Sequence, residues 1–315
     1  MLPLDAGGCR FAVASIMNET WEVLQKVQPA VEDSLSSSSG DPSDDNDVWL
    51  VIRKDAAQLV EAEPDLLSAV EKGILRHSRF KDAITSRLAI AFENDIMNAT
   101  EWAAAINRVF DESDLEEIAK IDISVIKERD PACSNLASAF LFFKGYKCLQ
   151  AHRIAHALWT SGKRSLSFAI QSRCSELYCI DIHPAARIGS GLMIDHGTGV
   201  VIGETTVMGR NCSILHGVTL GGSGKEKFDR HPKIGNDVLI GCHAIVLGNI
   251  RIGNNCNIGA GSVVLRSLPD NVIAVGNPAR IVGKPKSTRS GSAMDVELSD
   301  VDIPCGACFH ESWSI

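Results

Sequence analysis

Two short motifs place an aspartate and a histidine at a spacing that suits acid–base chemistry. The first is Asp181-Ile-His-Pro and the second is Ile194-Asp-His196-Gly, so His196 follows Asp181 by fifteen positions. A carboxylate that accepts a hydrogen bond from one ring nitrogen makes the other nitrogen a better general base near neutral pH. Such a pair fits acyl transfer in which the substrate supplies the nucleophile. The alternative is that both residues are surface residues at strand corners.

These motifs lie in a region with a six-residue repeat. A period of six matches neither a helix nor the two-residue alternation of an ordinary strand. It predicts a β-helix with three short strands, or about 18 residues, per coil, which would bring the two motifs within contact range on neighbouring coils. An earlier run from Ile188 uses the same unit and shifts by two residues between Val200 and Ile202. Each six-residue unit begins with an aliphatic residue, called its head below. In the later run, which starts at Ile234, the heads are Ile234, Ile240, Val246, Ile252, Ile258 and Val264.

The repeat is interrupted once by a polar insertion. Residues 221–233 read GGSGKEKFDRHPK, which the solenoid has to extrude as a loop. Loops that leave a rigid scaffold commonly carry function, and this one brings Asp229, Arg230 and His231 together. The alternatives are a tolerated insertion without a role and charges that are merely solvated.

The chain divides into four predicted parts and belongs to the α+β class. Residues 1–47 contain the run SLSSSSGDPSDDND and are predicted to be a flexible acidic extension. Residues 48–175 are predicted to form an all-α domain, residues 176–285 the β-helix, and residues 286–315 a mobile C-terminal tail. The helical spacing is seen in Leu66, Val70 and Ile74 after a Pro-Asp helix start, and in Ile84, Leu88 and Phe92.

Composition excludes several classes of protein. The net charge of −8, with no Lys/Arg cluster interleaved with aromatics, argues against nucleic acid as the main partner. No apolar stretch reaches the roughly 20 residues of a membrane span. No secretory or transit signal is convincing, so the expected location is the cytosol. The cysteines inside the repeat, Cys212, Cys242 and Cys256, are expected to be buried thiols.

The segments DIHPAARIGSGLMIDHGTGVVIGET, GVTLGGSGKEKFDRHPKIG, IGAGSVV and VGNPARIVGKP resemble the serine O-acetyltransferases. This family makes O-acetyl-L-serine and CoA from L-serine and acetyl-CoA in cysteine biosynthesis, on a left-handed parallel β-helix. The resemblance covers about residues 49–285, including the Glu-Arg-Asp-Pro-Ala motif at 128–132. The acidic N-terminal extension looks plant-like.

The resemblance implies roles for individual residues. His196 would be the general base for the serine hydroxyl, oriented by Asp181. The serine-binding residues would be Asp130, Asp195, Arg230 and His231, with Arg230 on the carboxylate, the acids on the ammonium group, and His231 or a backbone N–H facing the oxyanion. Without the family, Asp130 before Pro131 would be read as a helix-ending turn residue. Glu204 could serve binding or lie at a strand edge.

The resemblance also implies a coenzyme site and an oligomer. Acetyl-CoA would be a co-substrate, not a permanent cofactor, in a groove between adjacent β-helices of a homotrimer, with two trimers stacked through the helical domains. The run GGSGK at 221–225 lacks the strand-to-helix context of a phosphate-binding loop. The residues expected at the coenzyme are Gly222, Cys242, Ala260, Arg280 and Lys284.

The C-terminus suggests a protein partner. In the family a terminal isoleucine docks into O-acetylserine sulfhydrylase, and Ile315 is present. The preceding residues Glu-Ser-Trp-Ser depart from the Asp-Tyr-Val that often comes before it.

Three other functions compete with serine acetylation. A β-helix acyltransferase for a sugar or another amine would keep a histidine base but has no need of Arg230 with two carboxylates. A carbonic-anhydrase-type metalloenzyme needs three histidines converging between subunits. A regulatory subunit would act mainly through its tail.

Two other groups of residues could suggest a metal or redox site. His152 and His156 on one helical face are predicted to be packing residues, and Cys305, Cys308 and His310 form only a weak zinc or redox motif.

Overall fold

The computed structural model describes residues 47–225, 227–286 and 291. They form two compact units that divide between Ala157 and Leu158, inside helix α8 (Lys144–Thr160). The helices run from Val48 to Tyr178 and the strands from Ile180 to Gly283, close to the predicted change at 175–176. The predicted N-terminal extension lies outside the described residues apart from Asp47, which caps α2 (Val48–Ala62), and so does the predicted tail apart from 286 and Gly291. None of the helices in the described ranges is long and apolar enough to cross a membrane.

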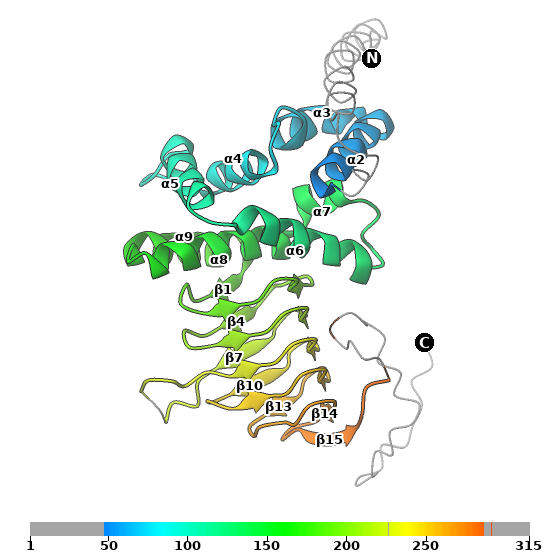
Figure 1. Cartoon of the computed structure of the whole chain (residues 1–315), viewed down its shortest axis with the longest axis vertical. Coiled ribbons are helices and arrows are strands. Elements are labelled where there is room, and N and C mark those ends of the chain that lie inside the picture. Colours follow the sequence, from blue (N-terminus) through cyan, green and yellow to red (C-terminus); the bar gives the residue numbers. More distant parts are fainter. Residues whose placement is uncertain (1–46, 226, 287–290, 292–315) are drawn as a thin grey trace, which may run out of the picture. The chain divides into compact units, whose positions relative to one another are not determined.

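The first unit is all-helical, as predicted (Figure 1). Its aromatic core joins Trp49, Phe80 and Phe140, whose ring centroids lie 5.4–6.2 Å apart. The predicted stripe of Ile84, Leu88 and Phe92 is buried. The elements before α8 are α2 (Val48–Ala62), η2 (Pro64–Leu66), α3 (Leu67–Val70), η3 (Glu71–Leu75), α4 (Phe80–Phe92), α5 (Ala99–Asp111), α6 (Leu115–Arg129) and α7 (Leu136–Phe142).

A buried ion pair links α6 to α8 within this unit. The Asp122 side chain is fully buried, and its Oδ2 and Oδ1 accept hydrogen bonds from Arg153 Nε at 2.5 Å and Nη2 at 2.9 Å. Gln150 Nε2 donates to the same carboxylate at 3.0 Å. A buried charge is tolerated only when it is paired in this way, so the three residues fix the register between the two helices.

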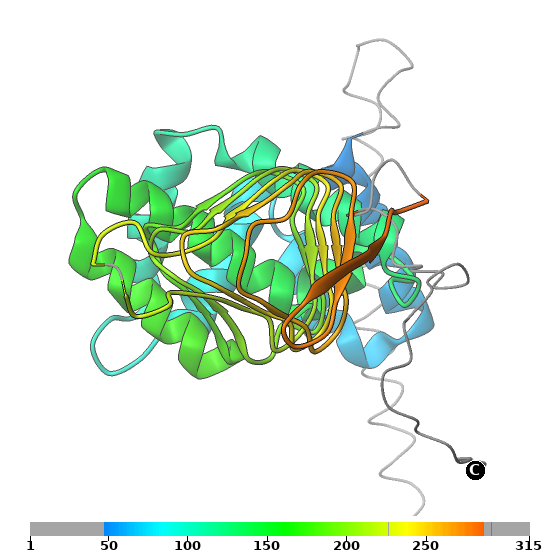
Figure 2. The same ribbon diagram turned by 90° about the horizontal axis from the view of Figure 1, so that it is seen from below.

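The second unit begins with the end of α8 and α9 (Arg164–Tyr178) and continues as a parallel β-helix. Its strands form three sheets in the orders β1-β4-β7-β10-β13, β11-β8-β5-β2 and β15-β14-β12-β9-β6-β3, and among the described strands only β14 and β15 pair antiparallel. Figure 2 looks along the stack and shows the coils superposed. The strands are β1 (Ile180–Ile182), β2 (Arg187–Ile188), β3 (Met193–Ile194), β4 (Val200–Ile202), β5 (Val207–Met208), β6 (Ser213–Ile214), β7 (Thr219–Gly221), β8 (Lys233–Ile234), β9 (Leu239–Ile240), β10 (Ile245–Leu247), β11 (Arg251–Ile252), β12 (Asn257–Ile258), β13 (Val263–Val264), β14 (Ile273–Val275) and β15 (Arg280–Gly283).

The aliphatic heads of the repeat form the core of the coils, as predicted. Ile234 pairs with Ile252, one predicted coil further along the chain, and all six heads of the later run are at most 4% exposed. Cys212 and Cys256 are buried as expected, whereas Cys242 is only half-buried because it lies at a corner between two sheets. Burial of the heads explains why the repeat tolerates polar residues elsewhere but not at these positions.

One corner of the first coil carries two extra residues. Ile180 pairs with Val200, whereas Ile234 pairs with Ile252, so the first coil is two residues longer than the later coil and than the prediction. Ile194 pairs with Ile214, and Val201 pairs with Thr219, on the next coil. Val201 follows Ile194 by seven positions, whereas Thr219 follows Ile214 by only five. The shift noticed in the sequence is therefore a corner insertion, and it contains His196.

A second set of corners is held by side chains that bond the neighbouring coil. Asn236 Oδ1 accepts from Arg210 N at 2.8 Å, and Asn254 Oδ1 accepts from Asn236 N at 2.8 Å. Gly291, within the predicted tail, is buried against the same side, where its N donates to Asp237 O at 3.0 Å and its O accepts from Ser213 Oγ at 2.5 Å. At this point the chain beyond the β-helix contacts the solenoid.

Replacing Asp122 tests the buried ion pair. Asp122→Ala removes the carboxylate to which the buried Arg153 guanidinium is hydrogen-bonded, so we expect the free energy of unfolding to fall by about 3–5 kcal/mol. Chemical denaturation followed by circular dichroism measures this. The double variant Asp122→Leu/Arg153→Leu, which removes both charges, should recover most of the loss; equal instability of the two proteins would contradict the interpretation.

Candidate active site

His196 projects from the inserted corner into solvent. Its backbone is left-handed (φ 55°), and its side chain is 72% exposed. Gly197 follows with φ 71° and lies so close to Ile180 that an added Cβ would approach the Ile180 Cδ1 to 2.5 Å. Glycine is thus required beside the histidine, and the tight turn directs the imidazole outward. Its Nε2 lies 3.8 Å from Asp195 Oδ1.

Asp181 is held by a helix of the same unit. Its Oδ1 accepts a hydrogen bond from Gln171 Nε2, on α9, at 2.6 Å. Because the first coil does not close until Val200, Asp181 and His196 belong to the same coil and not to neighbouring ones. The interaction of Asp181 with His196 stays a prediction, and Gln171 is a partner that the sequence did not reveal.

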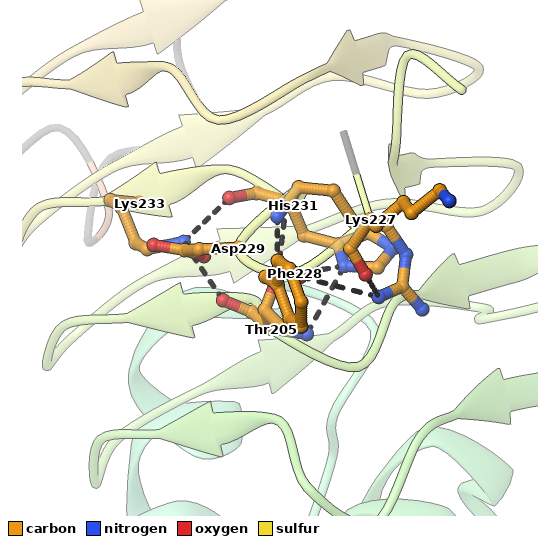
Figure 3. Close-up of polar contacts among 7 residues, drawn as sticks. Thr205, Lys227, Phe228, Asp229, His231 and Lys233 are labelled. Carbon is orange, nitrogen blue, oxygen red and sulfur yellow. Dashed lines mark hydrogen bonds and ion pairs between the residues drawn. The ribbon is translucent and has the colours of Figure 1, made fainter. Parts of the chain in front are cut away.

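The loop 222–232 is organised around one hydroxyl group, that of Thr205 (Figure 3). Thr205 Oγ1 accepts from the backbone N–H groups of Arg230 and His231, both at 3.0 Å. Lys233 Nζ closes the loop by donating to Asp229 Oδ1 at 2.6 Å, His231 O at 2.7 Å and Thr205 O at 2.9 Å. The loop predicted from the interrupted repeat is therefore fixed at its base.

Arg230 is paired with a glutamate from the preceding coil. Arg230 Nη2 lies 2.7 Å from Glu204 Oε2, and this hydrogen bond is the main cause that lowers the pKa of Glu204. Arg230 Nη1 also reaches the carbonyl groups of Lys227 and Phe228. The Arg230 side chain is about one-third exposed, and these contacts orient its guanidinium before any ligand arrives.

His231 is a buried neutral donor. Its Nδ1 accepts from Thr205 N at 3.1 Å, and because a backbone N–H can only donate, the proton of the neutral ring is on Nε2. Burial is the main cause that lowers the pKa of His231, and the charge of Arg230 adds to it. A Cβ on Gly203 would lie 2.1 Å from the ring, so only glycine leaves room for the imidazole.

A row of histidines extends from His196 across neighbouring coils. The ring centroids of His196 and His216 lie 5.7 Å apart, and those of His216 and His243 lie 4.9 Å apart. His243 is left-handed (φ 57°) at a corner where its counterparts are Gly217 and Gly261. Neither His216 nor His243 was singled out from the sequence, because both look like ordinary corner residues of the repeat.

The expected coenzyme residues fall into three places of the second unit. Cys242 and Ala260 share a corner on adjacent coils, where Gly261 N donates to Cys242 O at 2.8 Å. Gly222 lies beside Arg230, whose Cγ would be 3.4 Å from an added Cβ. Arg280 in β15 and Lys284 just after it are exposed at the last coil.

Other predicted residues lie elsewhere. Asp130 ends α6 in the first unit, where its Oδ1 accepts from Ala132 N at 2.8 Å, which is the turn geometry expected from its proline neighbour. His152 is buried on α8, and the His152 and His156 rings lie 6.1 Å apart. No group of three or more potential metal ligands occurs in the described ranges. Cys305, Cys308, His310 and Ile315 are outside them.

Comparisons with known proteins agree with this architecture. The family model "Serine acetyltransferase, N-terminal" matches residues 48–151, and "Bacterial transferase hexapeptide (six repeats)" matches residues 231–266. Serine acetyltransferase 4 of Arabidopsis thaliana is 45% identical over 82% of this chain and 72% of its own length.

Two solved structures are similar over most of the chain. Serine acetyltransferase from Brucella abortus, in complex with coenzyme A, is 41% identical with a TM-score of 0.76, covering 79% of this chain and 100% of that one. The enzyme from Neisseria gonorrhoeae, in complex with serine, is 44% identical with a TM-score of 0.73, covering 78% of this chain and 100% of that one.

Thr205 offers a test of how the loop 222–232 is held. Thr205→Val keeps the shape of the side chain but removes the oxygen that two backbone N–H groups and the His231 ring use, so we expect a loss of about 1–3 kcal/mol in the free energy of unfolding. Thr205→Ser, which keeps the hydroxyl, serves as the matched control. Denaturant titration compares the three proteins, and a Val variant as stable as the Ser variant would show that the hydroxyl does not support the loop.

Proposed function

Given that this chain belongs to the serine acetyltransferase family, we propose that His196 is the general base with which it transfers the acetyl group of acetyl-CoA to L-serine. His196 takes the proton of the serine hydroxyl as its oxygen attacks the thioester carbonyl carbon. The tetrahedral intermediate then breaks its C–S bond, and the departing thiolate receives the proton from His196. The products are O-acetyl-L-serine and CoA.

The exposed corner at His196 is the observation that carries this proposal. The imidazole is the predicted base, it leaves the coil at a two-residue insertion, and a left-handed backbone turns it away from the core. The nearby Asp195 carboxylate and the hydrogen-bonded Asp181 provide acids on the same coil, and we assign Asp181 to orient the ring.

The loop 222–232 supplies the proposed serine-binding residues. Arg230 has a planar guanidinium already oriented by Glu204, which suits the carboxylate of an α-amino acid. Asp195 is assigned to the ammonium group, and the role predicted for Asp130 stays a prediction. The serine complex of the Neisseria gonorrhoeae relative supports serine as the ligand.

His231 is the proposed donor to the oxyanion. Its Nδ1 is occupied by Thr205 N–H, so the Nε2–H is the polar group that it can offer to a ligand. A donor that is oriented before the reaction stabilises developing negative charge at little reorganisation cost. Because its pKa is lowered, the ring stays neutral at pH values where the base must also be neutral.

Acetyl-CoA is proposed to lie along the corner that carries Cys242 and Ala260. The coenzyme A complex of the Brucella abortus relative supports this co-substrate. Gly222 lies beside Arg230, and the exposed cations Arg280 and Lys284 suit the phosphate groups of the coenzyme. We propose that a neighbouring copy in a homotrimer completes the groove that binds acetyl-CoA, and that two such trimers pair. We also propose that Ile315 docks into O-acetylserine sulfhydrylase and that the protein acts in the cytosol.

The base is tested by release of CoA thiol from acetyl-CoA in the presence of L-serine. For His196→Ala we expect kcat to fall by about 10²–10⁴-fold, because a positioned base contributes roughly that factor. His77→Gln, in the helical unit, is the control histidine and should keep wild-type activity. Size-exclusion chromatography confirms that each variant keeps its assembly, and a correctly assembled His196→Ala protein with wild-type kcat would sink the assignment.

The two acids near the base are separated by their kinetic effects. Asp181→Asn should lower kcat by about 10-fold or more with little change in the KM for serine, because it acts on the histidine. Asp195→Asn should mainly raise the KM for serine, because it is assigned to the ammonium group. The opposite pattern would exchange the two roles, with Asp195 orienting His196.

A further inference from the structure

The row of histidines, His196, His216 and His243, lies at one corner of three successive coils. His196 is in the corner between β3 and β4, His216 in the corner between β6 and β7, and His243 in the corner between β9 and β10. Backbone hydrogen bonds join these corners, from Gly217 N to Thr198 O at 2.8 Å and from His243 N to His216 O at 2.9 Å. Because these bonds fix the spacing between the coils, the three side chains follow one edge of the β-helix.

His216 is the middle member of the row and contacts both other rings. Its ring plane makes an angle of 77° with that of His196 and 89° with that of His243, which is the edge-to-face arrangement that aromatic rings prefer. The His243 ring also lies over Gly217, where an added Cβ would be 2.2 Å from the His243 Nδ1. Glycine after His216 therefore leaves room for the ring that supports His216 on its far side.

His216 differs from two other histidines of this unit, whose Nδ1 atoms are held by backbone donors. Ala185 N donates to His183 Nδ1 at 3.1 Å, so the proton of that neutral ring is on Nε2. Thr205 N holds His231 in the same way. The Nδ1 of His216 is buried and has no hydrogen-bond partner in the part of the chain that the structure describes. The contacts that define the place of His216 are therefore those of its ring with two neighbouring rings.

The His196 imidazole needs such a neighbour because it lies in solvent. Its side chain is 72% exposed, and its Nε2 lies 3.8 Å from Asp195 Oδ1, which is too far for a hydrogen bond. Exposed side chains change rotamer within picoseconds to nanoseconds, whereas a catalytic group has to stay within about 0.5 Å of its productive position. The His216 ring limits the rotation of the imidazole on the side of the next coil.

We infer that His216 is a positioning residue for acetyl transfer, whose ring packs on His196 and keeps this base in the orientation that receives the serine proton. His243 supports His216 from the coil beyond. The inference rests on the proposed role of His196 as the general base. It requires the ring of His216 but not its nitrogens, whereas a proton relay would require both nitrogens.

Three substitutions separate positioning from proton transfer. His216→Phe keeps an aromatic ring against His196 but removes both nitrogens. His216→Ala removes the ring, and His216→Asn replaces it with a smaller polar group that suits an exposed corner. If His216 transferred protons, the Phe variant would be as slow as the other two. If its ring positions the base, the Phe variant should recover most of the activity.

The measurement is steady-state kinetics of the full-length protein with serine and acetyl-CoA varied separately. We expect His216→Ala and His216→Asn to lower kcat by about 10-fold or more, because a misplaced base loses its alignment, with both KM values within about twofold of wild type. Size-exclusion chromatography checks the assembly, and the Asn variant carries the test if the Ala variant does not assemble. A wild-type kcat in the assembled Ala or Asn variant, or a Phe variant as slow as these, would overturn the inference.

A double-mutant cycle shows whether His243 acts through His216. His243→Ala alone should lower kcat by a smaller factor than His216→Ala, and the double variant should be no slower than His216→Ala, because no ring is left to support. Full additivity would contradict the inference. His196→Ala identifies a failure of the proposed function. If it keeps a wild-type kcat, the base itself is misassigned, whereas a slow His196→Ala protein beside a normal His216→Ala protein removes only the role of His216.

Discussion

The second unit depends on one constraint: each coil of the β-helix must return its aliphatic heads to the same internal columns. Every residue beyond the usual coil length therefore has to leave the prism between strands. The described chain does this at the corner before β4 and at the loop between β7 and β8. His196 lies at the first place, and Arg230 and His231 lie at the second. The proposed chemistry is thus concentrated where the repeat is broken.

Much of the architecture could be predicted because the repeat makes its residues equivalent. The β-helix, its core columns and the extruded loop follow from the six-residue period, and the helical half follows from apolar spacing. The length of the first coil could not be derived from the later, shorter coils, because an extra pair of residues at a corner leaves the spacing within each strand unchanged. Likewise, Leu66, Val70 and Ile74 predict a helix but not its division into η2, α3 and the π-helical η3.

The candidate site could be predicted only for residues whose chemistry shows in a motif. Arg230 and His231 stood out because charged groups gathered in one insertion. Thr205 could not be found in this way, since a threonine beside a strand usually has no special role, and its importance depends on two backbone N–H groups 25 and 26 residues away. The tautomers of His183 and His231 depend similarly on backbone donors that local sequence does not reveal. The Arg230 guanidinium is already paired with Glu204, so a zwitterionic ligand would add no net charge to this ion pair.

The antiparallel pair β14–β15 closes the solenoid at its last coil. A stack in which each coil touches only its neighbours frays from its free end, and the inner coils open last. Arg280 lies on the closing strand, whereas Arg230 and His231 are anchored by Thr205 several strands further in. Thermal fraying would therefore release the cations assigned to the coenzyme before it disturbed the loop assigned to serine, so the two halves of the site have unequal local stability.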